Sequence, residues 1–124
     1  MDKELAVQSL TDTMAKFTAY IGKRLPKDVK SKLIELKTLE TNPFAKSIYD
    51  SMDENQEAAD RLNRPSCQDT GVIQYFVEAG AHLPLLGELQ EILREATEEA
   101  TRTGPLRHNA VETFDEKNTG TNTG

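Results

Sequence analysis

A chain of 124 residues, 36% hydrophobic and 29% charged, can form one domain with a modest core. Its net charge of -6 argues against a nucleic-acid-binding protein, because such proteins usually carry a basic surface. No apolar run approaches the ~18 residues of a membrane span, and the start Met-Asp-Lys-Glu lacks the pattern of a secretory signal. Since one cysteine cannot form an internal disulfide, we expect a cytoplasmic protein.

Three amphipathic helices are predicted within the first 62 residues. The first covers residues 3–22, and the second begins at Pro26, which suits the first turn of a helix. The third begins at Asn42-Pro43, because asparagine caps a helix and proline fits directly after it. In the first two predicted helices the apolar residues recur every three to five positions: Leu5, Leu10, Met14, Phe17 and Ile21; Val29, Leu33, Leu36 and Leu39. In the third, Phe44, Ile48 and Met52 continue the apolar stripe, and Ala58, Ala59 and Leu62 extend it.

The pattern changes after Arg64-Pro65. Residues 72–77 are rich in β-branched and aromatic side chains, which predicts a strand covered on both faces. Residues 84–103 predict a fourth helix, and residues 106–112 an extended segment. We therefore expect an α+β fold that is mostly helical. An N-terminal helical layer would be followed by the beginning of an incomplete αβ domain, consisting of its first strand or strands and a further helix. Such a sheet would have unpaired edges, so we expect a fragment, or a chain that needs a partner.

Cys67 and Asp69 are the first candidate site residues. In an extended segment both side chains would point to the same side, and Gly71 would leave room for a bulky inorganic group. A thiolate is a soft ligand suited to iron–sulfur clusters, and a nearby carboxylate could transfer a proton. The alternatives are a buried, inert cysteine and an aspartate that only forms a turn before the strand.

Arg107 and His108 are the second candidate pair. The planar guanidinium of Arg107 could bind a substrate carboxylate through two hydrogen bonds, although an arginine in a loop is usually only solvated. His108 could donate a hydrogen bond or carry a proton, but we interpret it, like His82, as structural. The Asn-Thr-Gly repeat at residues 118–124 is either an anion-binding loop or a plain surface loop.

Four motifs in this order carry a resemblance to a known family. They are Asn-Arg-Pro-Ser-Cys-Gln-Asp-Thr-Gly at 63–71, Pro-Leu-Leu-Gly-Glu-Leu-Gln at 84–90, Leu-Arg-His-Asn-Ala-Val-Glu at 106–112 and Asn-Thr-Gly-Thr-Asn-Thr-Gly at 118–124. Together they resemble the N-terminal part of an alpha subunit in the class I iron–sulfur fumarase and tartrate dehydratase family. On that resemblance residues 1–124 are one part of a hydro-lyase subunit, with a helical segment at 1–62 and the start of the cluster-binding and substrate-binding αβ region at 63–124.

The resemblance implies a [4Fe-4S] cluster held by three cysteines, of which Cys67 is one. It also implies that Gln68, Asp69 and Arg107 contact a dicarboxylate substrate, with Asp69 giving a proton to the departing hydroxyl. A separate beta subunit would complete the site, in a heterotetramer. The residues of the last two motifs resemble tartrate dehydratases more than fumarases, which favours dehydration of L(+)-tartrate to oxaloacetate.

Two other functions stay open. One is a class I fumarate hydratase subunit that acts on malate and fumarate. The other is a non-catalytic helical interaction module with an inert cysteine. Because the chain contains one of three cluster ligands and no obvious base for carbon deprotonation, we expect it to be truncated and inactive alone.

Overall fold

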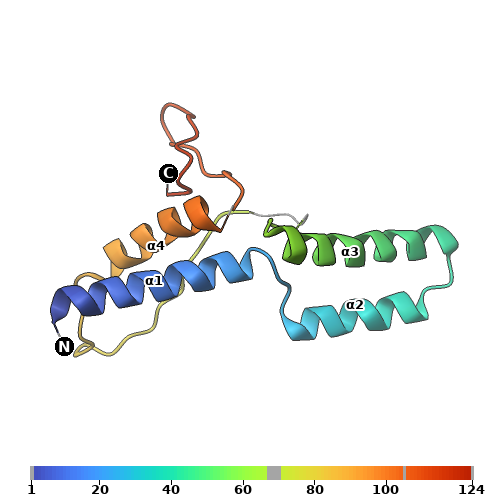
Figure 1. The fold of residues 1–124 in the computed structure, drawn as a ribbon, viewed down its shortest axis with the longest axis horizontal. Coiled ribbons are helices and arrows are strands. Elements are labelled where there is room, and N and C mark those ends of the chain that lie inside the picture. The colour runs from blue at the N-terminus through green and yellow to red at the C-terminus, as the bar shows by residue number, and fades with distance from the viewer. Residues whose placement is uncertain (1, 67–70, 105, 124) are drawn as a thin grey trace. The chain divides into compact units, whose positions relative to one another are not determined.

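The computed structural model describes residues 2–66, 71–104 and 106–123, and this part of the chain contains four helices (Figure 1). They are α1 (Lys3–Ile21), α2 (Lys27–Leu39), α3 (Pro43–Leu62) and α4 (Leu89–Thr103). The chain divides into two compact units. One consists of Met1–Tyr20 together with Thr70–Gly124, and the other of Ile21–Asp69. None of the described helices is long and apolar enough to cross a membrane.

In the first unit, α1 packs against α4 through small side chains. Ala15 of α1 and both Ala96 and Ala100 of α4 are buried and form one cluster. The contact is closest where α4 ends, since a Cβ atom on Gly104 would lie 2.4 Å from the Cβ of Ala19. Alanine and glycine allow the two helix backbones to approach each other closely, and Met14 and Leu106 pack against the alanine cluster.

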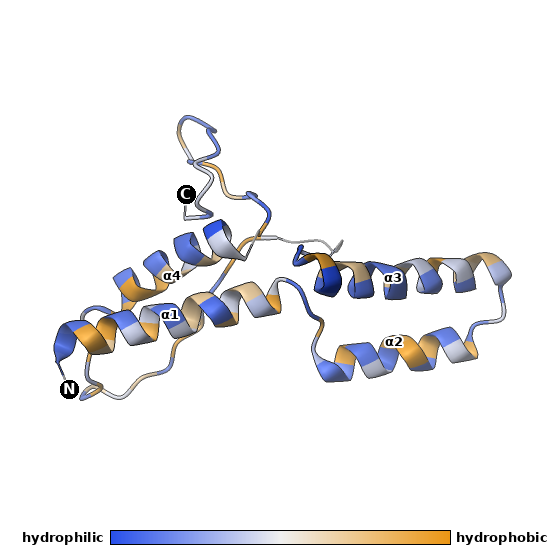
Figure 2. Ribbon diagram, viewed as in Figure 1, coloured by the Kyte–Doolittle hydropathy of each residue, from blue (hydrophilic) through white to orange (hydrophobic). Residues whose placement is uncertain are grey.

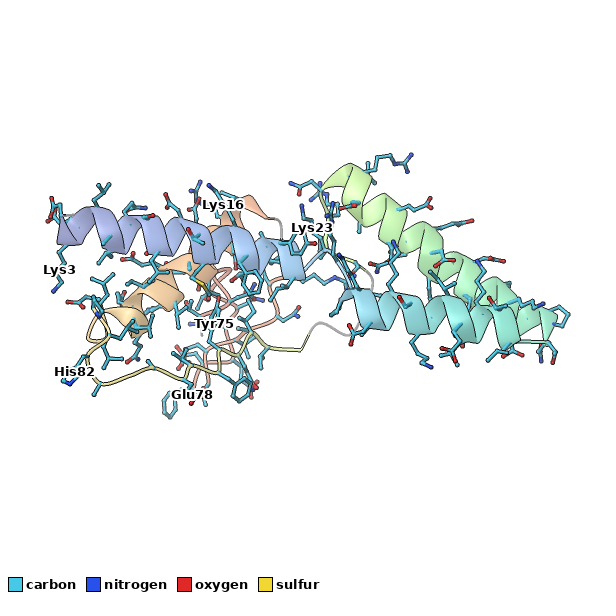
Figure 3. All side chains as sticks on the ribbon, turned by 90° about the horizontal axis from the view of Figure 1, so that it is seen from below. Lys3, Lys16, Lys23, Tyr75, Glu78 and His82 are labelled. Carbon is cyan, nitrogen blue, oxygen red and sulfur yellow. The ribbon has the colours of Figure 1, made fainter. Side chains whose placement is uncertain are left out.

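Tyr75 attaches the irregular segment at residues 71–80 to both α1 and α4. The Tyr75 side chain is labelled in Figure 3. Its hydroxyl lies 2.8 Å from the Oγ1 of Thr18 on α1 and 3.1 Å from the Oγ1 of Thr97 on α4. Thr18 is 1% exposed and Thr97 is 4% exposed. A buried hydroxyl without a hydrogen bond is costly, so these three groups satisfy one another.

The predicted α+β fold is wrong, because the described residues form no sheet. Residues 71–80 have no regular secondary structure, and the described part of the chain has only an isolated antiparallel bridge, between Val111 and Asn118. A strand exists only when its backbone groups pair with a second strand, and β-branched composition cannot supply that partner. The expected burial on both faces also fails, since Phe76 is 91% exposed.

The fourth helix begins later than predicted. It starts at Leu89 rather than at Pro84, and turns precede it, in which the N–H of Leu86 donates to the carbonyl oxygen of Leu83. Leu85 has a φ of +68°, which is incompatible with an α-helix. Gly87 also weakens a helix at this point, because glycine loses the most backbone entropy when it becomes helical.

The second unit is a hairpin of α2 and α3, which run side by side (Figure 1). As predicted, α3 begins after Asn42, whose side-chain oxygen accepts hydrogen bonds from the N–H groups of Phe44 and Ala45. Lys37 of α2 joins the two helices through ion pairs of 2.7 Å to Asp50 and 2.8 Å to Asp53. Charged side chains therefore fix how the two helices of the hairpin face each other.

Arg24, which precedes α2, binds the carboxylate of Asp60 with two hydrogen bonds of 2.8 and 2.9 Å. These hydrogen bonds hold the pKa of Asp60 below its usual range. At the end of α3, Asn63 adopts the left-handed conformation and accepts a hydrogen bond from Lys23. The base of the hairpin is thus closed by two side-chain contacts with the chain before α2.

Candidate functional site

Three of the four predicted site residues, Cys67, Gln68 and Asp69, lie outside the described residues. The neighbouring Ser66 is described, and its side chain is fully buried. None of the described residues offers a hydrogen-bond partner to its Oγ atom. A buried hydroxyl without a partner costs about 1–3 kcal/mol.

Arg107 lies in the segment that follows α4, and its side chain is exposed. No hydrogen bond or ion pair of its guanidinium to another described residue is found, whereas Arg102, in the last turn of α4, pairs with Glu99. An exposed guanidinium without a carboxylate partner keeps all its donors available for an anionic ligand.

Asn109 connects this segment with the residues that follow Cys67. Its side-chain N–H donates a 3.1 Å hydrogen bond to the carbonyl oxygen of Gly71. Gly71 has a φ of +50°, a conformation that favours glycine. Gly71, the last residue of the motif at 63–71, therefore contacts the motif at 106–112.

Asn122 holds the same segment from the other side, and its side-chain oxygen accepts hydrogen bonds of 2.9 and 3.3 Å from the N–H groups of Asn109 and Ala110. Its side-chain N–H group donates to the carbonyl oxygen of Arg107 at 2.8 Å and to the Oγ1 of Thr101 on α4 at 3.1 Å. One side chain thus fixes the backbone around Arg107 and joins it to a buried residue of α4.

Asn118 adds a third contact, because its side-chain N–H donates to the carbonyl oxygen of His108. We call Asn109, Asn118 and Asn122 the asparagine network. Sequence reasoning noted the motifs that contain these residues but missed the role of the amide side chains. The signal in the sequence for this role was that asparagine occurs in both motifs, at 106–112 and at 118–124.

The Asn-Thr-Gly repeat uses most of its donors within the protein. The N–H of Gly120 donates to the side chain of Asn118, and the hydroxyl of Thr121 lies 2.8 Å from those of both Thr119 and Thr123. The hydroxyl of Thr123 also donates to Glu98 on α4. Of the two predicted roles of this repeat, these contacts favour a structural loop over an anion-binding one.

Both histidines are exposed. His108 lies beside Gly120, where an added Cβ would come within 3.8 Å of its Nδ1 atom. Within the described ranges no group of three histidine, cysteine or acidic residues is arranged to hold a metal ion. The chain has one cysteine, and a cluster needs three or more ligands, so its donor set has the right chemistry but cannot hold a cluster alone.

Comparison with known proteins identifies the family. The sequence profile described as fumarate hydratase (Fumerase) matches residues 11–124, which is most of the chain.

The chain belongs to the fumarate hydratase family.

The curated relatives of this fumarate hydratase family member carry a more specific name. Proteins named L(+)-tartrate dehydratase subunit alpha, from Escherichia coli K12 and from Shigella sonnei, are each 57% identical over 99% of this chain. A Methanocaldococcus jannaschii protein, named provisionally as the same subunit, is 34% identical over 81% of it. The matched region covers 41% of each of the first two relatives and 36% of the third, so the chain spans about two fifths of their length.

Proposed function

We propose that residues 1–124 are the N-terminal part of the alpha subunit of an iron–sulfur hydro-lyase that converts L(+)-tartrate to oxaloacetate and water. The observation that carries the proposal is the asparagine network, which joins the Arg107 segment to Gly71, four residues after Cys67. The names of the relatives agree with it. The subunit would act in the cytoplasm, with a beta subunit, in a heterotetramer.

Arg107 would bind the substrate carboxylate that lies away from the reacting hydroxyl. Its guanidinium can form two parallel hydrogen bonds to a carboxylate, which fixes the orientation of the substrate as well as its position. Asn122 contributes indirectly, because its hydrogen bond to the carbonyl oxygen of Arg107 holds the backbone from which this side chain extends. Arg107 is therefore a substrate-binding residue in this proposal, and Asn122 a positioning residue.

Gln68 and Asp69 would contact the same substrate, with Asp69 protonating the hydroxyl that leaves as water. Loss of that hydroxyl and of the proton on the adjacent carbon gives an enol, which becomes oxaloacetate. Cys67 would provide one of three cysteine ligands of a [4Fe-4S] cluster, and other polypeptide would provide the rest. Such a cluster, when bound, supplies Lewis acidity toward the hydroxyl and a carboxylate oxygen.

The test uses the enzyme assembled with its beta subunit and compares two arginine variants. Arg107→Lys keeps the positive charge but loses the two-bond geometry, so we expect kcat/KM for L(+)-tartrate to fall about 30- to 100-fold, the equivalent of ~2–3 kcal/mol. Arg102→Lys is the matched control, because Arg102 is an exposed arginine on α4 paired with Glu99. Equal activities of the two variants would show that Arg107 does not bind substrate.

Two comparisons separate the other candidate functions. Higher kcat/KM for L-malate than for L(+)-tartrate would assign the subunit to a fumarate hydratase, the activity in the family description. Cys67→Ser should abolish the brown colour and the activity of the assembled enzyme, because a hydroxyl is a poor cluster ligand. Unchanged colour and activity would instead favour the helical interaction module.

A further inference from the structure

Asn109 extends from a backbone that is anchored to α4. Its N–H donates a 2.9 Å hydrogen bond to the side-chain oxygen of Asn122, whose amide group also donates to the Oγ1 of Thr101 on α4 at 3.1 Å. Thr101 is buried. Beyond Leu106, which packs against the alanine cluster, the loop after α4 is largely hydrophilic (Figure 2), so its path depends mainly on hydrogen bonds. The side chain of Asn109 therefore starts from a defined point of the first unit.

The partner of this side chain is the backbone of Gly71. The amide group of Asn109 donates to the carbonyl oxygen of Gly71 at 3.1 Å, and Gly71 has a φ of +50°. An added Cβ on Gly71 would meet no atom within 4 Å, so the backbone conformation, and not a lack of space, is what favours glycine here. Both residues belong to the first unit. The hydrogen bond thus joins two segments of one compact unit that lie 38 positions apart in the chain.

Each end of this hydrogen bond follows a proposed substrate-binding residue in the sequence. Gly71 comes two positions after Asp69, and Asn109 comes two positions after Arg107. Two residues of chain span at most about 7 Å, so the positions of Gly71 and Asn109 limit how far apart Asp69 and Arg107 can lie, whatever conformation the intervening residues adopt. In the proposed function these two side chains contact opposite ends of the substrate, and the same limit therefore applies to its length.

We propose that Asn109 is a positioning residue which, through its hydrogen bond to Gly71, selects dicarboxylates of four carbons over longer ones. This inference rests on the proposed function and adds a basis for substrate choice to it. A guanidinium that forms two hydrogen bonds to a carboxylate has a strict geometry, so a carboxylate displaced by one methylene binds it less well. Two binding groups held at a fixed separation favour one chain length, whereas two groups that can move apart accommodate several.

The test compares two competitive inhibitors, succinate and glutarate, which differ by one methylene, on the enzyme assembled with its beta subunit. The ratio of their inhibition constants does not depend on how much of the enzyme is active, so a loss of folded protein leaves it unchanged. We expect the wild type to bind succinate about 10-fold more tightly than glutarate, an effect that one methylene commonly has. Asn109→Ala should lower this ratio to about 3 or less.

Asn109→Asp is the second variant and covers the case in which Asn109→Ala does not assemble. Aspartate has the size of asparagine but cannot donate a hydrogen bond to the carbonyl oxygen of Gly71. Its negative charge should weaken the binding of both acids, so only the ratio of the two inhibition constants is compared. We expect the same loss of discrimination as in Asn109→Ala.

Tyr75→Phe is the matched control, because it removes hydrogen bonds to two buried threonines from the same unit but leaves Asn109 and Gly71 intact. Its ratio should stay within about twofold of the wild-type ratio. A wild-type ratio in both Asn109 variants, or an equal loss of discrimination in Tyr75→Phe, would overturn the inference. A wild type that turns over L(+)-tartrate but binds both acids equally would overturn it too, and would leave the proposed function standing. A wild type that neither turns over L(+)-tartrate nor binds either acid would overturn the proposed function and this inference with it.

Discussion

Asn122→Gly tests whether one side chain holds the Arg107 segment in place. Asn122 has a φ of +60°, which glycine adopts without strain, so this substitution removes the four side-chain hydrogen bonds without distorting the backbone. A hydrogen bond contributes about 0.5–1.5 kcal/mol net. Water can replace part of the lost contacts because Arg107 and Asn109 are exposed. We therefore expect the segment to be destabilised by about 2 kcal/mol.

Amide hydrogen exchange measures this loss locally. The N–H groups of Asn109 and Ala110 donate to Asn122, and a loss of about 2 kcal/mol predicts that both exchange roughly 30-fold faster in the variant. The N–H of Gly104, which donates to the carbonyl oxygen of Ala100 at the end of α4, is the internal reference and should not change.

Asn122→Asp refines the measurement, because it keeps the acceptor for both N–H groups and loses the two donated hydrogen bonds. It should accelerate exchange less than Asn122→Gly. The reasoning would be refuted if Asn109 and Ala110 exchanged at the wild-type rate in Asn122→Gly. An equal acceleration at Gly104 would indicate global destabilisation instead of local release.

Three further substitutions test the packing and the ion pairs. Gly104→Ala should lower the free energy of unfolding by about 1–3 kcal/mol, because its Cβ would overlap α1, whereas Gly87→Ala, with no atom near the added Cβ, should cost less than ~0.5 kcal/mol in denaturant titrations. Tyr75→Phe leaves a buried threonine hydroxyl without a partner and should cost about 1–2 kcal/mol in the same titrations, which an unchanged midpoint would contradict. Asp60 has a lowered pKa in the folded protein, so the stability from its pair with Arg24 is complete above the ordinary value of 3.8 and is lost as the pH falls through the lower folded value. Melting curves of wild type and Arg24→Gln should therefore converge as the pH falls below about 4, and a difference that persists at pH 2 would contradict this assignment.

The helices could be predicted because their signals are local. Asn42 and Pro43 mark the start of α3 through groups within one turn, so no distant residue is needed to decide where that helix begins. The strand at residues 72–77 failed for the opposite reason. A strand needs hydrogen bonds from a second segment, and within the described residues Tyr75 instead directs its hydroxyl to two helices.

The candidate site also has a part that local sequence could predict and a part that depends on tertiary contacts. The sequence by itself predicted which motifs would carry its chemistry, because the residue types at 63–71 and 106–112 are those that can ligate metal and bind carboxylates. Only the tertiary structure decided that Asn109 reaches Gly71 and that Asn122 holds the backbone of Arg107. These hydrogen bonds join residues 38 and 15 positions apart, and such contacts depend on how the chain folds back on itself rather than on any local preference.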